Sequence, residues 1–412
     1  MMKNFIANLG PGILYAAAAI GVSHLVQSTR AGADFGYQLA IVIVLANFIK
    51  YPFFKIGAIY TNSTQKSLLH GYKKLGPFGV PLFIFMTLAT MFVIEGAITV
   101  VTAGIFSHLI PYSLNIKVLS VIILLICTLI LLIGKYSILD NLIKVIVFIL
   151  TLTTVLAYVS SFFTPLATSD FTRDFSFSNN SHVYFLIALI GWMPAPMDIP
   201  VWHGLWVIEK NKTKSEKVSI KDSLLDFKIG YITTALLALC FMGLGAEVMY
   251  TSGQSFSDKA IVFSTELIDL YTKTLGSWAR PVIIIAAFTT MFSTAITCLD
   301  AFSRILLESF KIYDDTNQLT PKLSLPKLIF FISFGTLILI FFFLKNMKDL
   351  VDLATTISFI VAPVFAYMNF KVSKLDEIHQ DYRLKSYENI LCIIGIVFFV
   401  LFTFYYLITK FY

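Results

Sequence analysis

The feature that most constrains this chain is a proline-rich interruption inside an apolar segment running from about residue 183 to 208. Pro194, Pro196 and Pro200 lie close together there, and each proline removes a backbone donor and crowds the preceding helical turn. An apolar run of this length predicts a helix that crosses a membrane. Irregular backbone at membrane depth is stable only where it is buried in protein or lines a watery cavity. The segment therefore predicts a membrane protein with a broken helix in its interior.

A carboxylate, Asp198, lies inside this interruption. An ionisable side chain at membrane depth is costly and typically marks a functional site, so Asp198 indicates a substrate contact or a proton carrier. The alternative is structural, because a carboxylate two residues before Pro200 is well placed to cap the helix that follows. The two roles are compatible, and the residues alone leave both open.

The rest of the chain has the composition of an all-α, polytopic integral membrane protein. Of its 412 residues 57% are hydrophobic and 13% charged, whereas soluble domains carry about 25% charged residues. Eleven apolar segments of spanning length recur, with polar connections too short for a soluble domain. We expect these spans at about 9–31, 37–61, 79–107, 115–134, 139–163, 182–208, 224–249, 281–309, 326–345, 349–371 and 387–409.

The sequence carries no sign of an enzyme. It contains no phosphate-binding loop, dinucleotide fingerprint, nucleophile elbow or His-Glu-x-x-His motif, so we expect neither catalysis nor a bound cofactor. The four cysteines all fall in apolar segments and form no Cys-x-x-Cys pair, which argues against a disulfide framework or a zinc finger. The expected partners are the lipid bilayer and a transported ion or small solute. The oligomeric state is left open, and a monomer is compatible with the sequence.

Lysine and arginine are concentrated in alternate connections between the spans. The connection after the sixth span is the richest, with Lys210, Lys212, Lys214, Lys217 and Lys221. Because positive residues stay on the cytoplasmic side, we expect a cytoplasmic N-terminus and an extracytoplasmic C-terminus. This bias explains the net charge of +7 without nucleic-acid binding. With no cleavable signal or targeting peptide evident, a bacterial cytoplasmic (inner) membrane is the expected location.

A second interruption, Gly21–His24, lies in the first span, five spans before the first-described break. Inverted five-span repeats with broken first helices are a known transporter plan, with the substrate at the midplane between the breaks. We therefore predict a single transmembrane domain with discontinuous helices one and six. Its first repeat would cover about 9–163, its second about 182–371, and an eleventh helix at 387–409 would be extra.

His24 in the first break and Asp198 in the sixth-span break suggest a ligand pair. An imidazole suits transition metals and also titrates near physiological pH, whereas the alternative is a histidine satisfied by a freed backbone carbonyl. Two side chains alone supply too few ligands for a typical metal site. The groups able to complete it are the thioethers of Met193 and Met197 and the backbone carbonyls of Gly21 and Ala195.

Other polar residues at membrane depth are weaker candidates. Glu95 and His203, together with Asp198, suggest a proton route or a gate, because unpaired ionisable groups there are expensive. Ser23, Gln27 and Thr355 are candidate substrate contacts, although hydroxyls on membrane helices often bond only to their own backbone. At the outer mouth we expect Arg30 and Asp34 to be solvated, with a gating role as the alternative.

The N-terminal span also carries a resemblance to a known family. The first span begins with Gly10-Pro11-Gly12 and ends with Gly32-Ala33-Asp34-Phe35-Gly36-Tyr37. It resembles the first span of Nramp-type divalent-metal transporters, and the two sequences align without a gap from the first motif to the second. The resemblance implies the leucine-transporter (LeuT) fold and alternating access. In typical members it also implies proton-coupled import of manganese or iron.

The metal-binding motifs of that family have other residues here. The positions of its Asp-Pro-Gly-Asn motif read Gly21, Val22, Ser23 and His24. Anchored on His203, which matches a family histidine, the positions of its Met-Pro-His motif read Pro196, Met197 and Asp198, although a slip would instead match Met193-Pro194. Thr355 takes the place of a family glutamine that lines the site.

These observations predict a secondary active transporter. The leading hypothesis from the resemblance is a divalent metal ion as substrate, of manganese or iron type or of altered specificity, held by His24 and Asp198, with protons as a compatible coupling ion. The alternative is an amino acid or amine on the same fold, because half-helix N-termini can hold a carboxylate without a metal and Asp198 can hold an amine.

Overall fold

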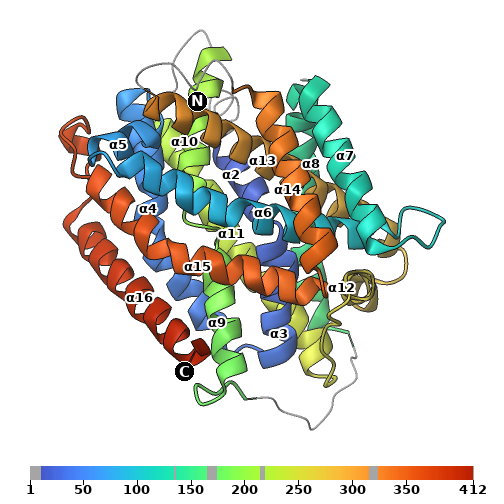
Figure 1. Ribbon diagram of the computed structural model, residues 1–412. Coiled ribbons are helices and arrows are strands. Elements are labelled where there is room, and N and C mark those ends of the chain that lie inside the picture. Colours follow the sequence, from blue (N-terminus) through green and yellow to red (C-terminus); the bar gives the residue numbers. More distant parts are fainter. Residues whose placement is uncertain (1–10, 134–135, 165–173, 214–218, 315–322, 412) are drawn as a thin grey trace.

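The computed structural model describes residues 11–133, 136–164, 174–213, 219–314 and 323–411, and all regular structure within these ranges is helical. Figure 1 shows long helices gathered into one bundle, with α3, α9 and the C-terminal end of α16 near one another at the same end. Gly10 of the resemblance, and Lys214 and Lys217 of the basic connection, lie outside the described residues.

The helices follow the expected spans closely. The long ones are α4 (Ala40–Thr64), α6 (Gly79–Phe106), α7 (Ile116–Ile133), α8 (Tyr136–Ser161), α11 (Ile220–Gly245), α13 (Ala279–Tyr313), α14 (Leu325–Phe343), α15 (Met347–Val372) and α16 (Ser386–Phe411). The shorter pieces are α2 (Pro11–Ala19), the π-helix η1 (Ser23–Ser28), α3 (Thr29–Phe35), α5 (Leu68–Lys74), α9 (Asn180–Trp192), α10 (Ile199–Thr213), the π-helix η2 (Ala246–Tyr250), α12 (Ala260–Leu275) and the single-turn η4 (Gln380–Tyr382).

Eight helices in the described part of the chain are long and apolar enough to cross a membrane, whereas the sequence predicted eleven spans. Two of the other three are the spans expected to be broken, which appear as short pieces in series. The third is α8, whose apolar stretch Phe148–Ser161 is too short to cross a membrane by itself. The expectation of an all-helical polytopic membrane protein is therefore confirmed at the level of these eight helices.

Both interruptions are present, with a shift in the first. The first span bends at Ile20–Gly21 and continues through η1 into α3, so residues 22–24 are helical rather than open. In the sixth span α9 ends at Trp192 and α10 begins at Ile199, with six non-helical residues between them. Pro194 and Pro196 cannot donate backbone hydrogen bonds, which explains why the helix stops there.

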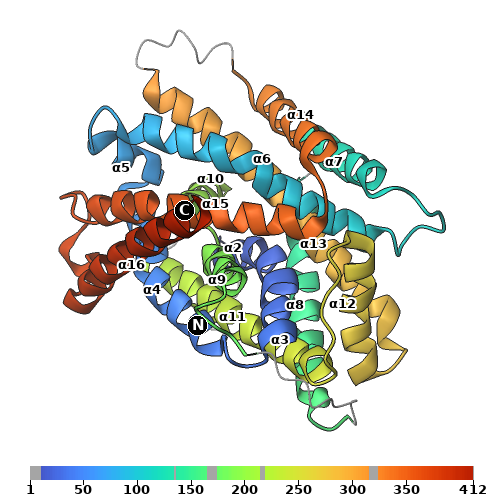
Figure 2. The same ribbon diagram turned by 60° about the horizontal axis from the view of Figure 1, so that its bottom comes forward.

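The broken spans lie in the middle of the bundle. Figure 2 shows α2, α3 and α9 between α11 on one side and α15 on the other, with α6, α7 and α14 stacked beyond α15. The helix α11 contacts α2, η1 and α3, and α15 contacts both α9 and α6. The two interruptions are thus enclosed by continuous helices, as irregular backbone at this depth requires.

Glycines allow α11 and the first span to touch backbone to backbone. A Cβ at Gly32 would lie 1.8 Å from the carbonyl oxygen of Met242, and one at Gly245 would lie 2.3 Å from that of Thr29. Gly12 and Gly230 form a second such crossing. Small residues at helix crossings are the usual means of close packing in membranes.

Gly32→Ala is therefore expected to destabilise the protein by about 2 kcal/mol or more, since relieving the clash requires α3 and α11 to separate. The measurement is the thermal unfolding midpoint of the purified protein in detergent. The matched control is Gly96→Ala, whose new methyl group would meet side chains alone, the nearest being the end of Leu339 at 3.3 Å. Equal midpoints for the two variants would contradict the close crossing.

Candidate functional site

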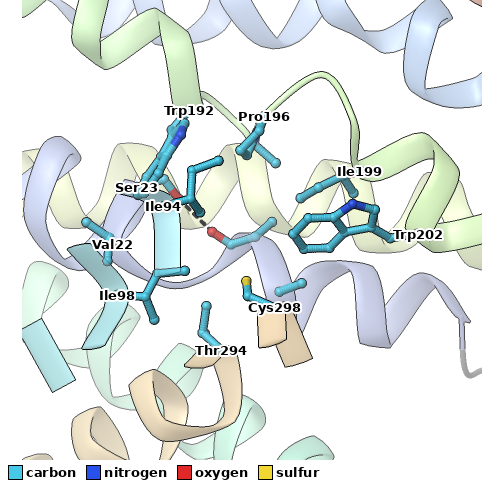
Figure 3. Close-up of a pocket in the computed structure, with 13 residues that line it drawn as sticks. Val22, Ser23, Ile94, Ile98, Trp192, Pro196, Ile199, Trp202, Thr294 and Cys298 are labelled. Carbon is cyan, nitrogen blue, oxygen red and sulfur yellow. Dashed lines mark hydrogen bonds between the residues drawn. The ribbon is translucent and has the colours of Figure 1, made fainter. Parts of the chain in front are cut away.

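A small cavity of about 20 Å³ lies between the two interruptions (Figure 3). It is enclosed by residues from both broken spans and from α6 and α13. The lining residues are Ala18, Ala19, Val22, Ser23, Ile94, Ile98, Trp192, Ala195, Pro196, Ile199, Trp202, Thr294 and Cys298. This volume is enough for about one water molecule, so the cavity is nearly closed in this conformation.

The cavity wall is mostly apolar. Its hydroxyl groups belong to Ser23 and Thr294, and both are engaged with backbone carbonyls: Ser23 Oγ lies 2.6 Å from Ala19 O, and Thr294 Oγ1 lies 3.0 Å from Thr290 O. Within the described residues the indole Nε1 of Trp202 has no hydrogen-bond partner, although this side chain is only 1% exposed. Such a wall suits an apolar or weakly polar group better than a bare ion.

His24 does not line the cavity, and both of its ring nitrogens are engaged. Its Nε2 donates to the backbone carbonyl of Thr234 on α11 at 2.9 Å, since a carbonyl can only accept. Its Nδ1 lies 2.8 Å from Ser23 Oγ, and the ring packs edge-on against Phe241. In this conformation the histidine is satisfied by a backbone carbonyl, which was the structural alternative raised by the sequence.

Asp198 is also buried but lies outside the cavity lining, directly before α10. Its Oδ1 has no hydrogen-bond partner in the described part of the chain. The described ranges contain no group of three or more His, Cys, Asp or Glu side chains able to hold a metal ion. His24 and Asp198 therefore belong to no such group, and a metal site that used them would need other ligands such as methionine sulfur or backbone carbonyls.

Lys50, which the sequence analysis did not single out, binds the break in the sixth span. This lysine of α4 is completely buried, and its Nζ donates to the carbonyls of Ile190, Gly191 and Ala195 at 2.7, 2.9 and 3.2 Å. A lysine near the middle of an apolar span is a signal that sequence reasoning could have used. Its partners, 140 to 145 positions away, were not readable from the sequence.

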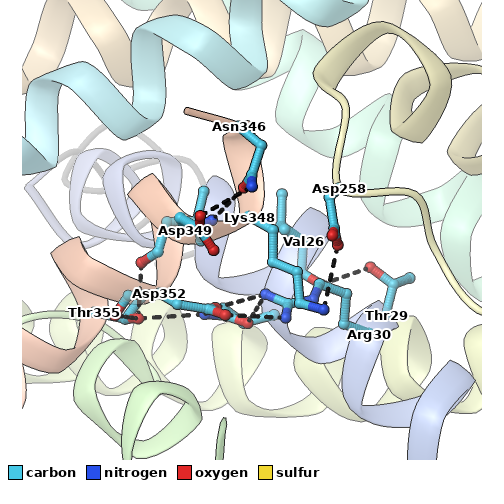
Figure 4. Close-up of polar contacts among 11 residues, drawn as sticks. Val26, Thr29, Arg30, Asp258, Asn346, Lys348, Asp349, Asp352 and Thr355 are labelled. Atoms are coloured by element: carbon cyan, nitrogen blue, oxygen red, sulfur yellow. Dashed lines mark hydrogen bonds and ion pairs between the residues drawn. The ribbon is translucent and has the colours of Figure 1, made fainter. Parts of the chain in front are cut away.

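Gln27 and Thr355 are hydrogen-bonded to each other in a polar network with Arg30 and Asp352, and Figure 4 shows the last three of these residues. Gln27 Nε2 donates to Thr355 Oγ1 at 3.3 Å and to Asp352 Oδ1 at 3.1 Å. Arg30 of α3 pairs with both oxygens of Asp352 on α15, at 2.6 and 3.2 Å, and also donates to Gln27 Oε1. The guanidinium lies 5.0 Å from the ring centre of Phe185.

Arg30 is only 4% exposed, so the expectation that it is solvated was wrong. Its ion pair joins α3 to α15, and both partners line a vestibule of about 750 Å³. The vestibule is lined by Arg30, Asp34, Phe35, Asp174, Ser181, His182, Tyr184, Phe185, Lys348, Asp349, Asp352, Leu353, Thr356, Tyr406 and Lys410. The first span thus leads from Ser23 at the cavity through Gln27 of this network to Arg30 at the vestibule.

The remaining predicted residues lie around the cavity without lining it. A Cβ at Gly21 would lie 3.0 Å from Thr294 Cγ2, and Met197 is buried. Glu95 is fully buried on α6, and neither of its carboxyl oxygens has a hydrogen-bond partner among the described residues. His203 is likewise buried against Phe227, with neither ring nitrogen paired in the described ranges. Of the predicted substrate contacts, Ser23 and Ala195 line the cavity directly.

Comparison with known proteins gives a consistent result along the whole chain. Residues 12–409 match the family described as Natural resistance-associated macrophage protein-like, or Nramp. An uncharacterized protein of Pasteurella multocida (strain Pm70) is 37% identical over 401 residues, which are 96% of this chain and 91% of that protein.

Two solved structures are similar in fold. The Eremococcus coleocola manganese transporter, in complex with an aromatic bis-isothiourea substituted compound, has a TM-score of 0.68 at 14% identity, covering 98% of this chain and 86% of that one. Mhp1, a nucleobase-cation-symport-1 family transporter with bromovinylhydantoin bound, has a TM-score of 0.59 at 14% identity, covering 97% and 92%. At these identities the likeness concerns the fold alone.

Proposed function

Because this chain belongs to the Nramp family, we propose that it is a secondary active transporter that moves a small substrate across the membrane by alternating access. The observation that carries the proposal is the cavity lined by both broken spans, with a vestibule further along the first span that the Arg30–Asp352 ion pair lines. Interrupted helices at membrane depth are a typical place for a transporter to bind its substrate.

We propose the finer architecture as eleven spans in a single domain. The eight long apolar helices, the two broken spans and α8 supply that number. Repeat one covers about 9–163, repeat two about 182–371, and α16 is the extra helix. In this arrangement the N-terminus is cytoplasmic and the vestibule opens outward in a bacterial inner membrane, as the distribution of basic residues favours.

Family membership favours a divalent metal ion as the substrate, and the manganese transporter of similar fold supports that candidate. Metal binding by this chain would require His24 and Asp198 to rearrange. His24 would have to leave the Thr234 carbonyl, and Asp198 would have to turn toward the cavity. Met197 and the carbonyls of Gly21 and Ala195 would complete the ligand set.

The geometry favours the second candidate, a small organic solute such as an amino acid or an amine. The wall of the cavity is mostly apolar, and the ammonium group of Lys50 is bonded to the Ala195 carbonyl at the break. At the same separation, the repulsion between Lys50 and a divalent ion is twice the repulsion between Lys50 and a singly charged amine. The similar fold of Mhp1 holds an organic ligand, bromovinylhydantoin, so such a fold accommodates one. We therefore propose the organic solute, with Ser23, Ala195 and Trp202 as direct contacts.

Uptake into proteoliposomes decides between the two candidates. We expect manganese, iron and magnesium to enter no faster than into protein-free liposomes, and at least one amino acid or amine to enter saturably. Asp198→Asn should lower that uptake about tenfold if Asp198 holds an amine, which corresponds to a loss of about 1.4 kcal/mol. Saturable manganese uptake that His24→Ala and Asp198→Ala both abolish would instead establish the metal ion as substrate.

Proton coupling is a separate proposal that rests on Glu95 and His203. Neither residue has a hydrogen-bond partner for its ionisable atoms within the described residues, and each adjoins a residue of the cavity wall, Ile94 for Glu95 and Trp202 for His203. Glu95→Gln is expected to reduce proton movement during uptake by about tenfold or more, since an amide cannot carry the proton. A pH-sensitive dye inside the vesicles measures this. Glu308→Gln, near the end of α13, is the control that should leave proton movement unchanged, and unaltered acidification in Glu95→Gln would exclude the route.

A further inference from the structure

The break between α9 and α10 holds a cation that belongs to the protein itself. Lys50 Nζ has three N–H donors, and the structure gives it three acceptors, the carbonyls of Ile190, Gly191 and Ala195 at 2.7 to 3.2 Å. The side chain is 0% exposed. The ammonium group is therefore fully coordinated by backbone oxygen, without help from a carboxylate in the described part of the chain.

These carbonyls are available because the helix ends at prolines. In a continuous helix the N–H of residue 194 would donate to the carbonyl of Ile190, but Pro194 has no N–H. This carbonyl instead accepts from the Met193 N–H at 3.2 Å and from Lys50 Nζ. Gly191 likewise lies in the last turn of α9, where carbonyls lack helical partners. The end of a helix also carries the negative pole of its dipole, which attracts a cation. The sequence at the break thus creates a cage of oxygen atoms suited to a positive charge.

Oxygen cages of this kind are the usual ligands of hard inorganic cations in membrane proteins. We propose that Lys50 Nζ is a tethered cation that occupies such a cation site at the α9–α10 break, so that the transporter needs no inorganic ion there. This role of Lys50 in transport rests on the proposed function. Lys50 is then also a determinant of substrate specificity, because its fixed charge excludes a second cation from the Ala195 carbonyl.

The proposal predicts that removing the amine creates a site for a free cation. Lys50→Ala shortens the side chain and removes the amine donor from all three carbonyls, of which Ile190 keeps the bond from the Met193 N–H. In choline chloride the variant should unfold at a clearly lower temperature than the wild type. Adding sodium or potassium chloride at equal ionic strength should raise its midpoint saturably, by on the order of 3 °C, because an ion that binds only the folded state stabilises it. The wild type should show no such dependence on the cation.

Two further variants sharpen the test. Lys55→Ala is the matched control on the same helix: it removes the partner of Glu388 and should lower the midpoint without any cation-specific recovery. Lys50→Met, which fills the space without charge, should be destabilised and unresponsive to cations. If Lys50→Ala does not fold, Lys50→Ser carries the same test, since it also leaves the cage open.

Lys50→Ala or Lys50→Ser that unfolds at the same temperature in sodium, potassium and choline would overturn the proposal, as would a wild type that responds to the cation as they do. The readout is thermal unfolding of the purified full-length protein and needs no substrate. A failure of every uptake assay would therefore count against the transport function, while the thermal-unfolding result would still test the cation site.

Discussion

Modification of Cys298 with a small methanethiosulfonate reagent is expected to abolish transport. Cys298 of α13 lines the cavity between the two breaks, and that cavity has only about 20 Å³ to spare. Even a methylthio adduct would fill this cavity and exclude the substrate. Each tenfold fall in uptake that results corresponds to a loss of about 1.4 kcal/mol of binding free energy. We expect uptake to fall by at least about tenfold, with mass spectrometry used to establish that the thiol has reacted.

The native cysteines supply the controls for this experiment. Cys127, Cys240 and Cys392 do not line the cavity, so Cys298→Ser should transport normally and resist the reagent. Substrate present during labelling should protect the wild type. Stoichiometric modification of Cys298 with undiminished uptake would show that the substrate does not pass through this cavity.

The sequence was sufficient to predict the plan of the molecule because the plan depends on local chemistry. Apolar runs of spanning length predicted the long helices, and Pro194 and Pro196 predicted where the sixth span would break. Prolines and hydropathy act within a few residues of the chain, so no tertiary information was needed. In the first span, where no proline fixes the break, the interruption lies at Ile20–Gly21 rather than across Gly21–His24.

The chemistry of the site was harder to predict because it depends on contacts between distant segments. His24 was read as a ligand candidate, but its Nε2 is bonded to a carbonyl 210 positions away on α11. Arg30 was expected in solvent, and it is buried against Asp352, 322 positions away. Lys50 binds carbonyls of α9 that become available only once that helix has broken. In each case a backbone or ionic partner on another helix decides what the side chain does.

The second large effect is expected at the ion pair between Arg30 and Asp352. Arg30 and Asp352 both line the vestibule, and their pair joins α3 to α15 within the network of Gln27 and Thr355. Breaking it leaves the other partner without its counter-charge in a partly buried position. Because Asp352 is 32% exposed, we expect a cost of about 1–3 kcal/mol rather than the larger cost of a fully buried pair.

Arg30→Ala should therefore shift the equilibrium between the closed and open conformations toward the open one. We expect the equilibrium constant to change by about tenfold or more, since about 1.4 kcal/mol corresponds to a factor of ten. The measurement is the rate at which a membrane-impermeant thiol reagent, added on the vestibule side, reaches Cys298. Asp258→Ala is the matched control. Its ion pair with Lys348 lies close to the same network (Figure 4), but both side chains are about half exposed, and exposed pairs contribute little.

The exchanged pair, Arg30→Asp with Asp352→Arg, distinguishes a barrier from a merely structural contact. If attraction between α3 and α15 holds the vestibule closed, the exchange should slow labelling again, although only in part because the bond to Gln27 and the contact with Phe185 are lost. Labelling of Cys298 at the wild-type rate in both Arg30→Ala and Asp352→Ala would place the barrier elsewhere. The closest alternative is then the hydrogen bond from Trp192 to Ser358, which joins α9 to α15 beside the cavity.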